Sequence, residues 1–108
     1  MRRHWFYILL SLSERERNGS AIMRDVLELT GGALKLWPVT LYGSLDELED
    51  QGWIRMLPGP PPEAEGEGGH RKWFRITPAG RRALAREVAS LDALVRAAQH
   101  RLAQAAGA

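Results

Sequence analysis

The last third of the chain carries the feature that most limits its fold. From residue 84 onward, apolar side chains recur in alternating steps of four and three residues. A mean spacing of 3.5 residues is typical of a helix that packs lengthwise against other helices. The residues of this stripe are Leu84, Val88, Leu91, Val95, Ala98 and Leu102. Soluble monomers avoid a long exposed apolar face, so we expect either the first helix of the same chain or a second copy to cover it.

A strong helix start precedes this stripe. In Thr77-Pro78-Ala79-Gly80, Thr77 can cap the helix, and Pro78 fits its first turn, where a missing N–H costs nothing. The pattern predicts a helix from there to about residue 104. Because 108 residues suffice for one core only, residues 1–77 and 78–108 are two parts of one compact unit.

Five shorter segments are predicted before that helix. Helical spacing of apolar residues indicates helices over residues 3–12, from the Asn18-Gly19-Ser20 break to Gly31-Gly32, and from Pro38 to Gly52. Either Asn18 or Ser20 can cap the second helix. Residues 54–57 and 72–76 are rich in β-branched and aromatic residues and predict two strands. Residues 34–36 are compatible with a minimal strand, and the Pro-, Gly- and Glu-rich residues 58–69 with a mobile hairpin tip.

This order of elements predicts an α+β fold that is mainly helical. Three helices followed by a two-stranded hairpin is the order of a winged helix-turn-helix, here extended by a long C-terminal dimerisation helix. In that fold the third helix enters a DNA major groove, and the hairpin, or wing, lies along the phosphate backbone.

Five motifs give the chain a resemblance to a known family. They are Ile8-Leu9-Leu10-Ser11-Leu12, Asn18-Gly19-Ser20-Ala21-Ile22-Met23, Pro38-Val39-Thr40-Leu41-Tyr42, Leu45-Asp46-Glu47-Leu48-Glu49 with Gly52-Trp53-Ile54, and Arg75-Ile76-Thr77-Pro78-Ala79-Gly80. Through them the chain resembles the PadR-like transcriptional regulators over nearly its whole length. The third and last motifs at this separation are the most specific part. The resemblance implies a winged-helix dimer that represses transcription, of the short type with a single C-terminal helix.

The resemblance also implies which residues face DNA. Thr40, Tyr42 and Ser44 would lie on the DNA-facing side of the third helix, and Gly43 would allow a close approach of the backbone. Ser20 offers a hydroxyl at a helix N-terminus, where phosphate binds readily. The alternative for Thr40 and Ser44 is ordinary solvated surface. The chain departs from the family at Gly43, Asp46 and Glu47, where members often carry basic residues.

The positive charge that attracts DNA must therefore come from segments other than the third helix. The net charge of the whole chain is only +2. Lys35 precedes the third helix, Arg2 and Arg3 lie at the N-terminus, and His70, Arg71 and Lys72 lie at the return strand of the wing. We expect Arg71 and Lys72 to contact phosphates. The alternative is a solvated strand end, since the same loop carries three glutamates.

The first helix has more apolar surface than one neighbouring helix covers. We expect Trp5, Phe6 and Leu9 to take part in a dimer interface with the stripe at Leu84, Val88, Leu91, Val95 and Leu102. The resemblance implies the same arrangement, in which the last helix of one subunit lies against the first helix of its partner. Several members of the family respond to small aromatic ligands. Trp5 and Trp37 could line a gap for such an effector, although tryptophans at helical spacing usually belong to the core.

Several classes of function are not expected. The chain has no cysteine, which removes disulfides and thiolate zinc sites, and its three histidines are scattered. We therefore expect no enzyme, no metal and no cofactor. No apolar run reaches the roughly 20 residues of a membrane span, so we expect a cytoplasmic protein without a membrane partner. The main alternative is a winged-helix module that binds proteins or small molecules, with weak or no DNA binding.

Overall fold

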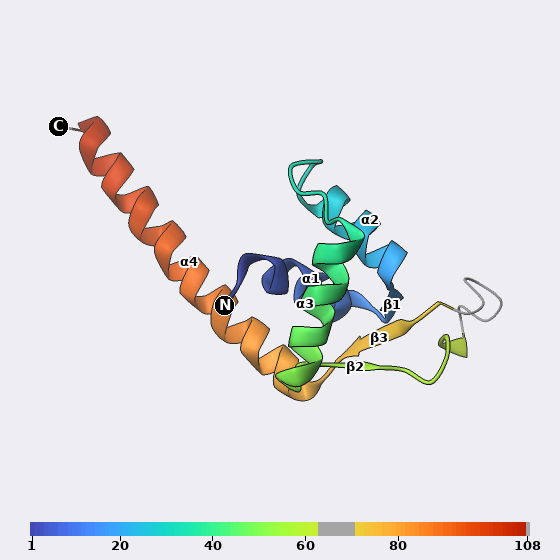
Figure 1. The fold of residues 1–108 in the computed structure, drawn as a ribbon. Coiled ribbons are helices and arrows are strands. Elements are labelled where there is room, and N and C mark those ends of the chain that lie inside the picture. Colours follow the sequence, from blue (N-terminus) through green and yellow to red (C-terminus); the bar gives the residue numbers. More distant parts are fainter. Residues whose placement is uncertain (63–70, 108) are drawn as a thin grey trace.

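A computed structural model describes residues 1–62 and 71–107 of the chain. These residues form four helices and a small three-stranded sheet that lies to one side of the first three helices (Figure 1). This confirms the predicted fold class. The elements in chain order are α1 (Arg3–Glu14), β1 (Arg17–Asn18), α2 (Gly19–Leu29), α3 (Pro38–Asp50), β2 (Ile54–Met56), β3 (Trp73–Ile76) and α4 (Pro78–Gly107).

The sheet is antiparallel, with the order β1-β3-β2. In the hairpin, or wing, Ile54 pairs with Ile76 and Met56 with Phe74. The third strand differs from expectation. Residues 34–36 form no strand, and Leu36 is instead buried in the core. The third strand is β1, which pairs with β3. It has two residues, too few to show an alternation of apolar and polar side chains in the sequence.

Local signals set the helix ends much as predicted. The Asn18 side chain, rather than that of Ser20, caps α2 by accepting a hydrogen bond of 2.9 Å from the Ala21 N–H. Pro38 occupies the first turn of α3. The Thr77 hydroxyl accepts a 3.0 Å hydrogen bond from the Gly80 N–H at the start of α4. Glycines with positive φ follow α2 and α3, namely Gly31, Gly32 and Gly52.

One core joins all these elements. Each of the first three helices turns an apolar stripe inward, and the sheet and the start of α4 close it from the other side (Figure 1). Leu29, the last residue of α2, is exposed, although it follows the buried Val26 at helical spacing. The buried apolar residues of the core are Ile8, Leu9, Leu12, Ile22, Val26, Leu36, Leu41, Leu45, Leu48, Ile54, Phe74, Ile76 and Leu84.

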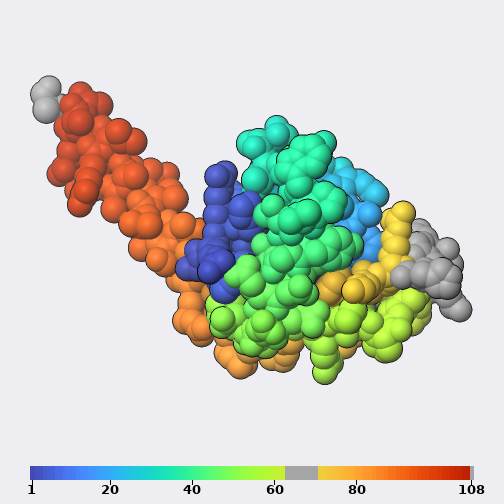
Figure 2. Space-filling model, in the orientation of Figure 1, coloured from blue at the N-terminus to red at the C-terminus, as the bar shows by residue number. Residues whose placement is uncertain are grey.

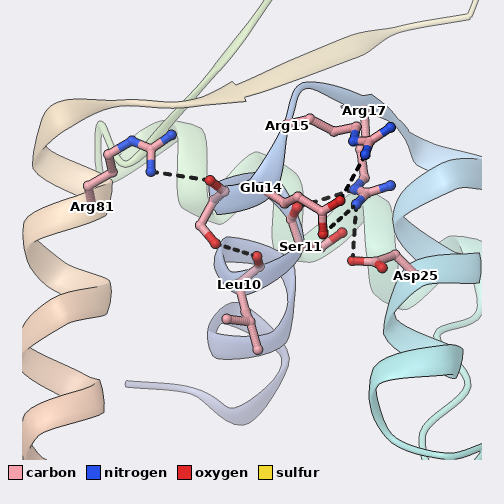
Figure 3. Close-up of polar contacts among 8 residues, drawn as sticks. Leu10, Ser11, Glu14, Arg15, Arg17, Asp25 and Arg81 are labelled. Atoms are coloured by element: carbon pink, nitrogen blue, oxygen red, sulfur yellow. Dashed lines mark hydrogen bonds and ion pairs between the residues drawn. The ribbon is translucent and has the colours of Figure 1, made fainter.

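A largely buried arginine holds the corner between α1 and α2. Arg17 lies 3.4 Å from the Glu14 carboxylate and 3.6 Å from that of Asp25, and it donates a 3.2 Å hydrogen bond to the Ser11 carbonyl (Figure 3). Its charge is therefore neutralised inside the subunit. On the far side of the same corner, Arg81 of α4 donates a hydrogen bond to the carbonyl of Ser13.

Helix α4 leaves the body of the protein after its first turns. Gly80, Ala83 and Leu84 are buried, whereas every residue from Val88 to Gly107 is exposed. Figures 1 and 2 show this part of α4 projecting away from the other elements. The longest dimension of the molecule is consequently 60 Å, against 28 and 26 Å for the other two.

Two further observations bear on the expectations. Among the described helices, none is both long and apolar enough to cross a membrane. Residues 63–69 of the predicted hairpin tip, and His70 at the return strand of the wing, lie outside the described residues.

Candidate nucleic-acid interface

The exposed face of α3 has two halves of different character. Its first two turns, residues 38–44, contain no charged residue, and Val39, Thr40, Tyr42 and Gly43 are all exposed there. Its last turns carry all four acidic side chains, Asp46, Glu47, Glu49 and Asp50. The uncharged half is also the N-terminal end, where the helix dipole is positive. An anion therefore meets favourable charge only at this end of α3.

Tyr42 links this half of α3 to the start of α2. Its side chain is 42% exposed. A Cβ atom placed on Gly19 would lie 2.5 Å from the Tyr42 hydroxyl oxygen and 3.0 Å from its ring. The phenol therefore lies directly over the backbone of the first residue of α2. The fold thus brings Tyr42 against Gly19, next to the half-buried Ser20.

Ser44 does not lie where it was expected. The structure leaves only 7% of Ser44 exposed, so its hydroxyl is not presented on the open face of α3. It lies one position before Leu45, on the side of α3 that turns toward α1, where it lines a shallow hollow with Trp5 and Thr40. We therefore remove Ser44 from the candidate DNA contacts.

The same hollow holds an ion pair that the sequence did not suggest. The Arg2 guanidinium donates a 2.7 Å hydrogen bond to the Glu47 carboxylate and lies 5.4 Å from the centre of the Trp5 ring. Arg2 precedes α1, and Glu47 lies in the acidic half of α3. The pair therefore neutralises one of the four acidic side chains next to the exposed face. Asp46, in contrast, is exposed.

Cationic side chains lie on both sides of α3. Lys35 precedes it, and the Lys35 ammonium lies 4.5 Å from the centre of the exposed Trp37 ring. Arg71 and Lys72 are exposed just before β3. Sequence reasoning missed Arg55, an exposed cation on β2 directly opposite Arg75. In Figure 2, α3 occupies the middle of the visible face with the strands of the wing beside and below it.

Two residues expected at a dimer interface belong to the subunit core. Leu9 is completely buried and Leu84 nearly so, because α1 packs between α2, α3 and the first turns of α4. Leu9 therefore has no side-chain surface left for a partner, whereas Leu84 keeps 8% exposure and lines a hollow on α4 with Val88. Trp5 and Phe6 are half-buried. The Trp5 ring meets the Trp53 ring edge-on, with 5.6 Å between the ring centres. The rest of the expected stripe is exposed: Val88, Leu91, Val95 and Leu102.

The two tryptophans considered for an effector gap face different neighbours. Trp5 packs on Trp53, whereas Trp37 is 62% exposed beneath Lys35. A separate hollow lies between α1 and α4, lined by Met1, Arg3, Phe6, Tyr7, Glu87 and Leu91. In the part of the chain that the structure describes, no cluster of acidic residues and histidines has the geometry to hold a metal ion.

Comparisons with known proteins place this geometry in context. The model of the transcriptional regulator PadR-like family matches residues 8–86. No curated protein matches the chain. Among solved structures, a transcriptional regulator from Clostridium thermocellum shares 23% identity and a TM-score of 0.72, with 89% of each chain covered. A PadR family regulator from Clostridium difficile shares 18% identity and a TM-score of 0.74, covering 91% of this chain and 96% of the other.

One similar structure contains nucleic acid. Bacillus subtilis PadR in complex with operator DNA has 24% identity and a TM-score of 0.67, over 82% of this chain and 48% of the other. At these identities the likeness shows a common fold.

Proposed function

Because the chain belongs to the PadR-like family of transcriptional regulators, we propose that it binds double-stranded DNA as a homodimer and represses transcription from a palindromic operator. The observation that carries this proposal is the division of α3 into an uncharged and an acidic half. Only the N-terminal half can approach a polyanion closely. Helix-turn-helix proteins contact base edges with this end of the groove helix. The solved complex of Bacillus subtilis PadR with operator DNA supports the choice of partner.

In the proposed complex, three groups of residues contact DNA. Thr40 and Tyr42 donate hydrogen bonds to base edges or phosphates, and Gly43, which has no side chain, lets the DNA come close to the helix backbone. Ser20 meets a phosphate at the start of α2, where unpaired N–H groups favour anions. Lys35, Arg71 and Lys72 neutralise phosphates on either side, which supplies affinity without sequence preference.

The homodimer is inferred from α4. An isolated helix is held together in water mainly when tertiary packing covers its apolar face, and most of α4, from Val88 to Gly107, is exposed within its own subunit. A second copy offers the matching surface, namely the same stripe and the half-buried Trp5 and Phe6. In a two-fold dimer each stripe is covered by identical residues of the partner.

The proposal is tested by measuring affinity for DNA as salt concentration rises. A selection from random DNA first supplies an operator, and fluorescence anisotropy then gives Kd at several salt concentrations. The logarithm of the binding constant should fall by about 0.9 per phosphate contacted for each unit of log salt. A flat response, with no sequence enriched, would instead favour a winged-helix module that binds proteins or small molecules.

Three variants separate contacts to phosphates from contacts that recognise the operator sequence. The double variant Arg71→Ala/Lys72→Ala should weaken binding to operator and to unrelated DNA equally and reduce the salt slope. Tyr42→Ala should weaken binding to the operator more than to unrelated DNA. Arg96→Ala is the matched control, because Arg96 is paired with Asp92 on the projecting part of α4. If neither Arg71→Ala/Lys72→Ala nor Tyr42→Ala alters a gel shift, the assigned contacts are wrong.

The hollow between α1 and α4 gives a second proposal, a small aromatic effector. It has aromatic walls at Phe6 and Tyr7, and Leu91 of the stripe forms part of it. A ligand there would touch the surface that we assign to the dimer. Isothermal titration with a panel of planar aromatic compounds tests this proposal, and loss of binding in Phe6→Ala is the expected result.

A further inference from the structure

Val39 is exposed to an extent that its own subunit does not explain. Its side chain is 88% accessible, more than any other large apolar residue in the described part of the chain. The next most exposed, Leu102 and Leu94, lie on the projecting part of α4, and Trp37 lies beneath the Lys35 ammonium. Val39 is in the first turn of α3 and stays open although it lines the same hollow as Arg2, Trp5 and Glu47.

The surroundings of Val39 favour close approach by a flat surface. One turn further along α3 stands Gly43, and a Cβ atom placed there would meet nothing within 4 Å. The isopropyl group therefore projects beside an open part of the helix surface. Thr40 and Tyr42 are also exposed in these turns, and no charged residue lies between residues 38 and 44.

The chemistry of this site matches one group on DNA. In the major groove a thymine is distinguished by its 5-methyl group, which apolar side chains contact directly. A β-branched side chain in a helix has essentially one rotamer, so little entropy is lost when Val39 is held against a base. We propose that Val39 is a specificity-determining residue that packs against the 5-methyl group of a thymine in each half-site.

This inference rests on the proposed function and assigns one position of the operator to a named side chain. The Thr40 and Tyr42 hydroxyls make polar contacts, but the methyl group of Thr40 can also meet the methyl group of a thymine. A cationic contact from Lys35 or the wing would be indifferent to the base. Val39 is the most exposed large apolar residue of this half of α3, and loss of the response in Val39→Ala would assign the contact to Val39 rather than to Thr40.

The test removes that methyl group from the DNA. Each thymine of the selected operator is replaced in turn by deoxyuridine, which lacks only the 5-methyl group, and Kd is measured by anisotropy. For the wild-type protein, one thymine per half-site should show a loss of about fourfold, the factor that corresponds to burial of one methyl group (~0.8 kcal/mol). Val39→Ala should bind the unmodified operator more weakly and show no further loss at that thymine.

Two control proteins complete the experiment. Leu29→Ala removes an exposed apolar side chain at the far end of α2 and should keep the full response to deoxyuridine. Val39→Thr keeps the shape of the side chain with one methyl group fewer and should keep part of the response. If no thymine responds in the wild type, or if Val39→Ala retains the loss, the inference is overturned. Failure to enrich any operator would instead overturn the proposed function.

Discussion

Two glycines show how single residues are used differently in this fold. Gly43 stands on the open face of α3, where a Cβ atom would meet nothing within 4 Å. Gly80 stands at the start of α4, where a Cβ atom would overlap the carbonyl oxygen of Trp53 and crowd Ile76. The first glycine leaves space for something outside the subunit, whereas the second is required for packing within it. The same substitution should therefore have opposite effects on stability.

Gly43→Ala should stabilise the protein and weaken its binding to the operator. Alanine in a helix interior is more favourable than glycine by roughly 0.5–1 kcal/mol, and the site has room for the methyl group. The same methyl group would hold the DNA away from the helix surface. Urea denaturation and operator anisotropy measure the two effects. A stabilised variant with unchanged affinity would show that Gly43 does not face DNA.

Gly80→Ala should destabilise the fold by about 1–3 kcal/mol, because the overlap with the Trp53 carbonyl forces the backbone of α4 away from the sheet. Urea denaturation measures the change, with Gly43→Ala as the matched glycine control. Unchanged stability in Gly80→Ala would mean that the start of α4 does not pack on Trp53 as closely as the structure shows.

The ion pair between Arg2 and Glu47 has a consequence for DNA binding. Arg2→Ala should lower operator affinity on the order of fivefold, because it leaves the carboxylate of Glu47 uncompensated on α3, and an exposed pair contributes up to ~1 kcal/mol. Glu47→Gln in the same chain should restore affinity. If the double variant stays weak, Arg2 itself contacts phosphate, and if Arg2→Ala binds normally, the pair has no role in binding.

At the scale of elements, α4 is one helix with two environments. Its first turns are fixed to α1 and to the sheet, whereas every residue from Val88 to Gly107 is exposed within its own subunit, although Leu91 still lines the hollow beside α1. In this exposed part Val88, Leu91 and Val95 share one side of the helix. On a helix Ala93 lies on the opposite side from Leu91. This pair gives a direct test of whether the stripe is an interface.

Leu91→Asp should convert the proposed dimer into monomers and abolish operator binding, since it places a charge in the proposed apolar seam. Light scattering gives the mass, and circular dichroism should show loss of helix because the uncovered part of α4 frays. Ala93→Asp is the control and should leave the dimer intact. An unchanged dimer mass in Leu91→Asp would exclude this face as the seam.

At the scale of the whole molecule, the proposed dimer would set the distance between its two α3 helices. Helix α4 is continuous with the compact body through Gly80 and Leu84, which are buried, so pairing of two α4 helices would fix where the two α3 helices stand. Two identical α3 helices related by a two-fold axis require two identical half-sites on DNA. The operator should therefore have a fixed spacing as well as a fixed sequence.

Selection from random DNA should yield half-sites in inverted orientation, with centres about 10 base pairs or a multiple of that apart. Inserting five base pairs between them should reduce affinity to that of a single half-site, because the second half-site then faces the opposite side of the duplex. Changing the intervening bases without changing their number is the control. Tolerance of the insertion would rule out a rigid dimer.

The sequence by itself determined those features that depend on neighbouring residues. Asn18, Pro38 and Thr77 mark helix starts because capping and proline geometry act within one turn. The stripe along α4 was predicted for the same reason, since its period follows from the helix alone. The order of the four helices and of the two hairpin strands, the fold class and the family followed from these local signals together with the motifs.

Only the tertiary structure decided which residues meet across the chain. Leu9 and Ser44 are buried because α1 and α3 pack together, and neither spacing nor polarity in the sequence revealed which edge of an apolar stripe is covered. Strand β1 exists because the edge of β3 is available to it. The pairing of Arg2 with Glu47 joins residues 45 positions apart. Long-range contacts of this kind depend on the packing angles of whole elements, which local sequence does not encode, and they also decide that Val39 is left exposed on α3.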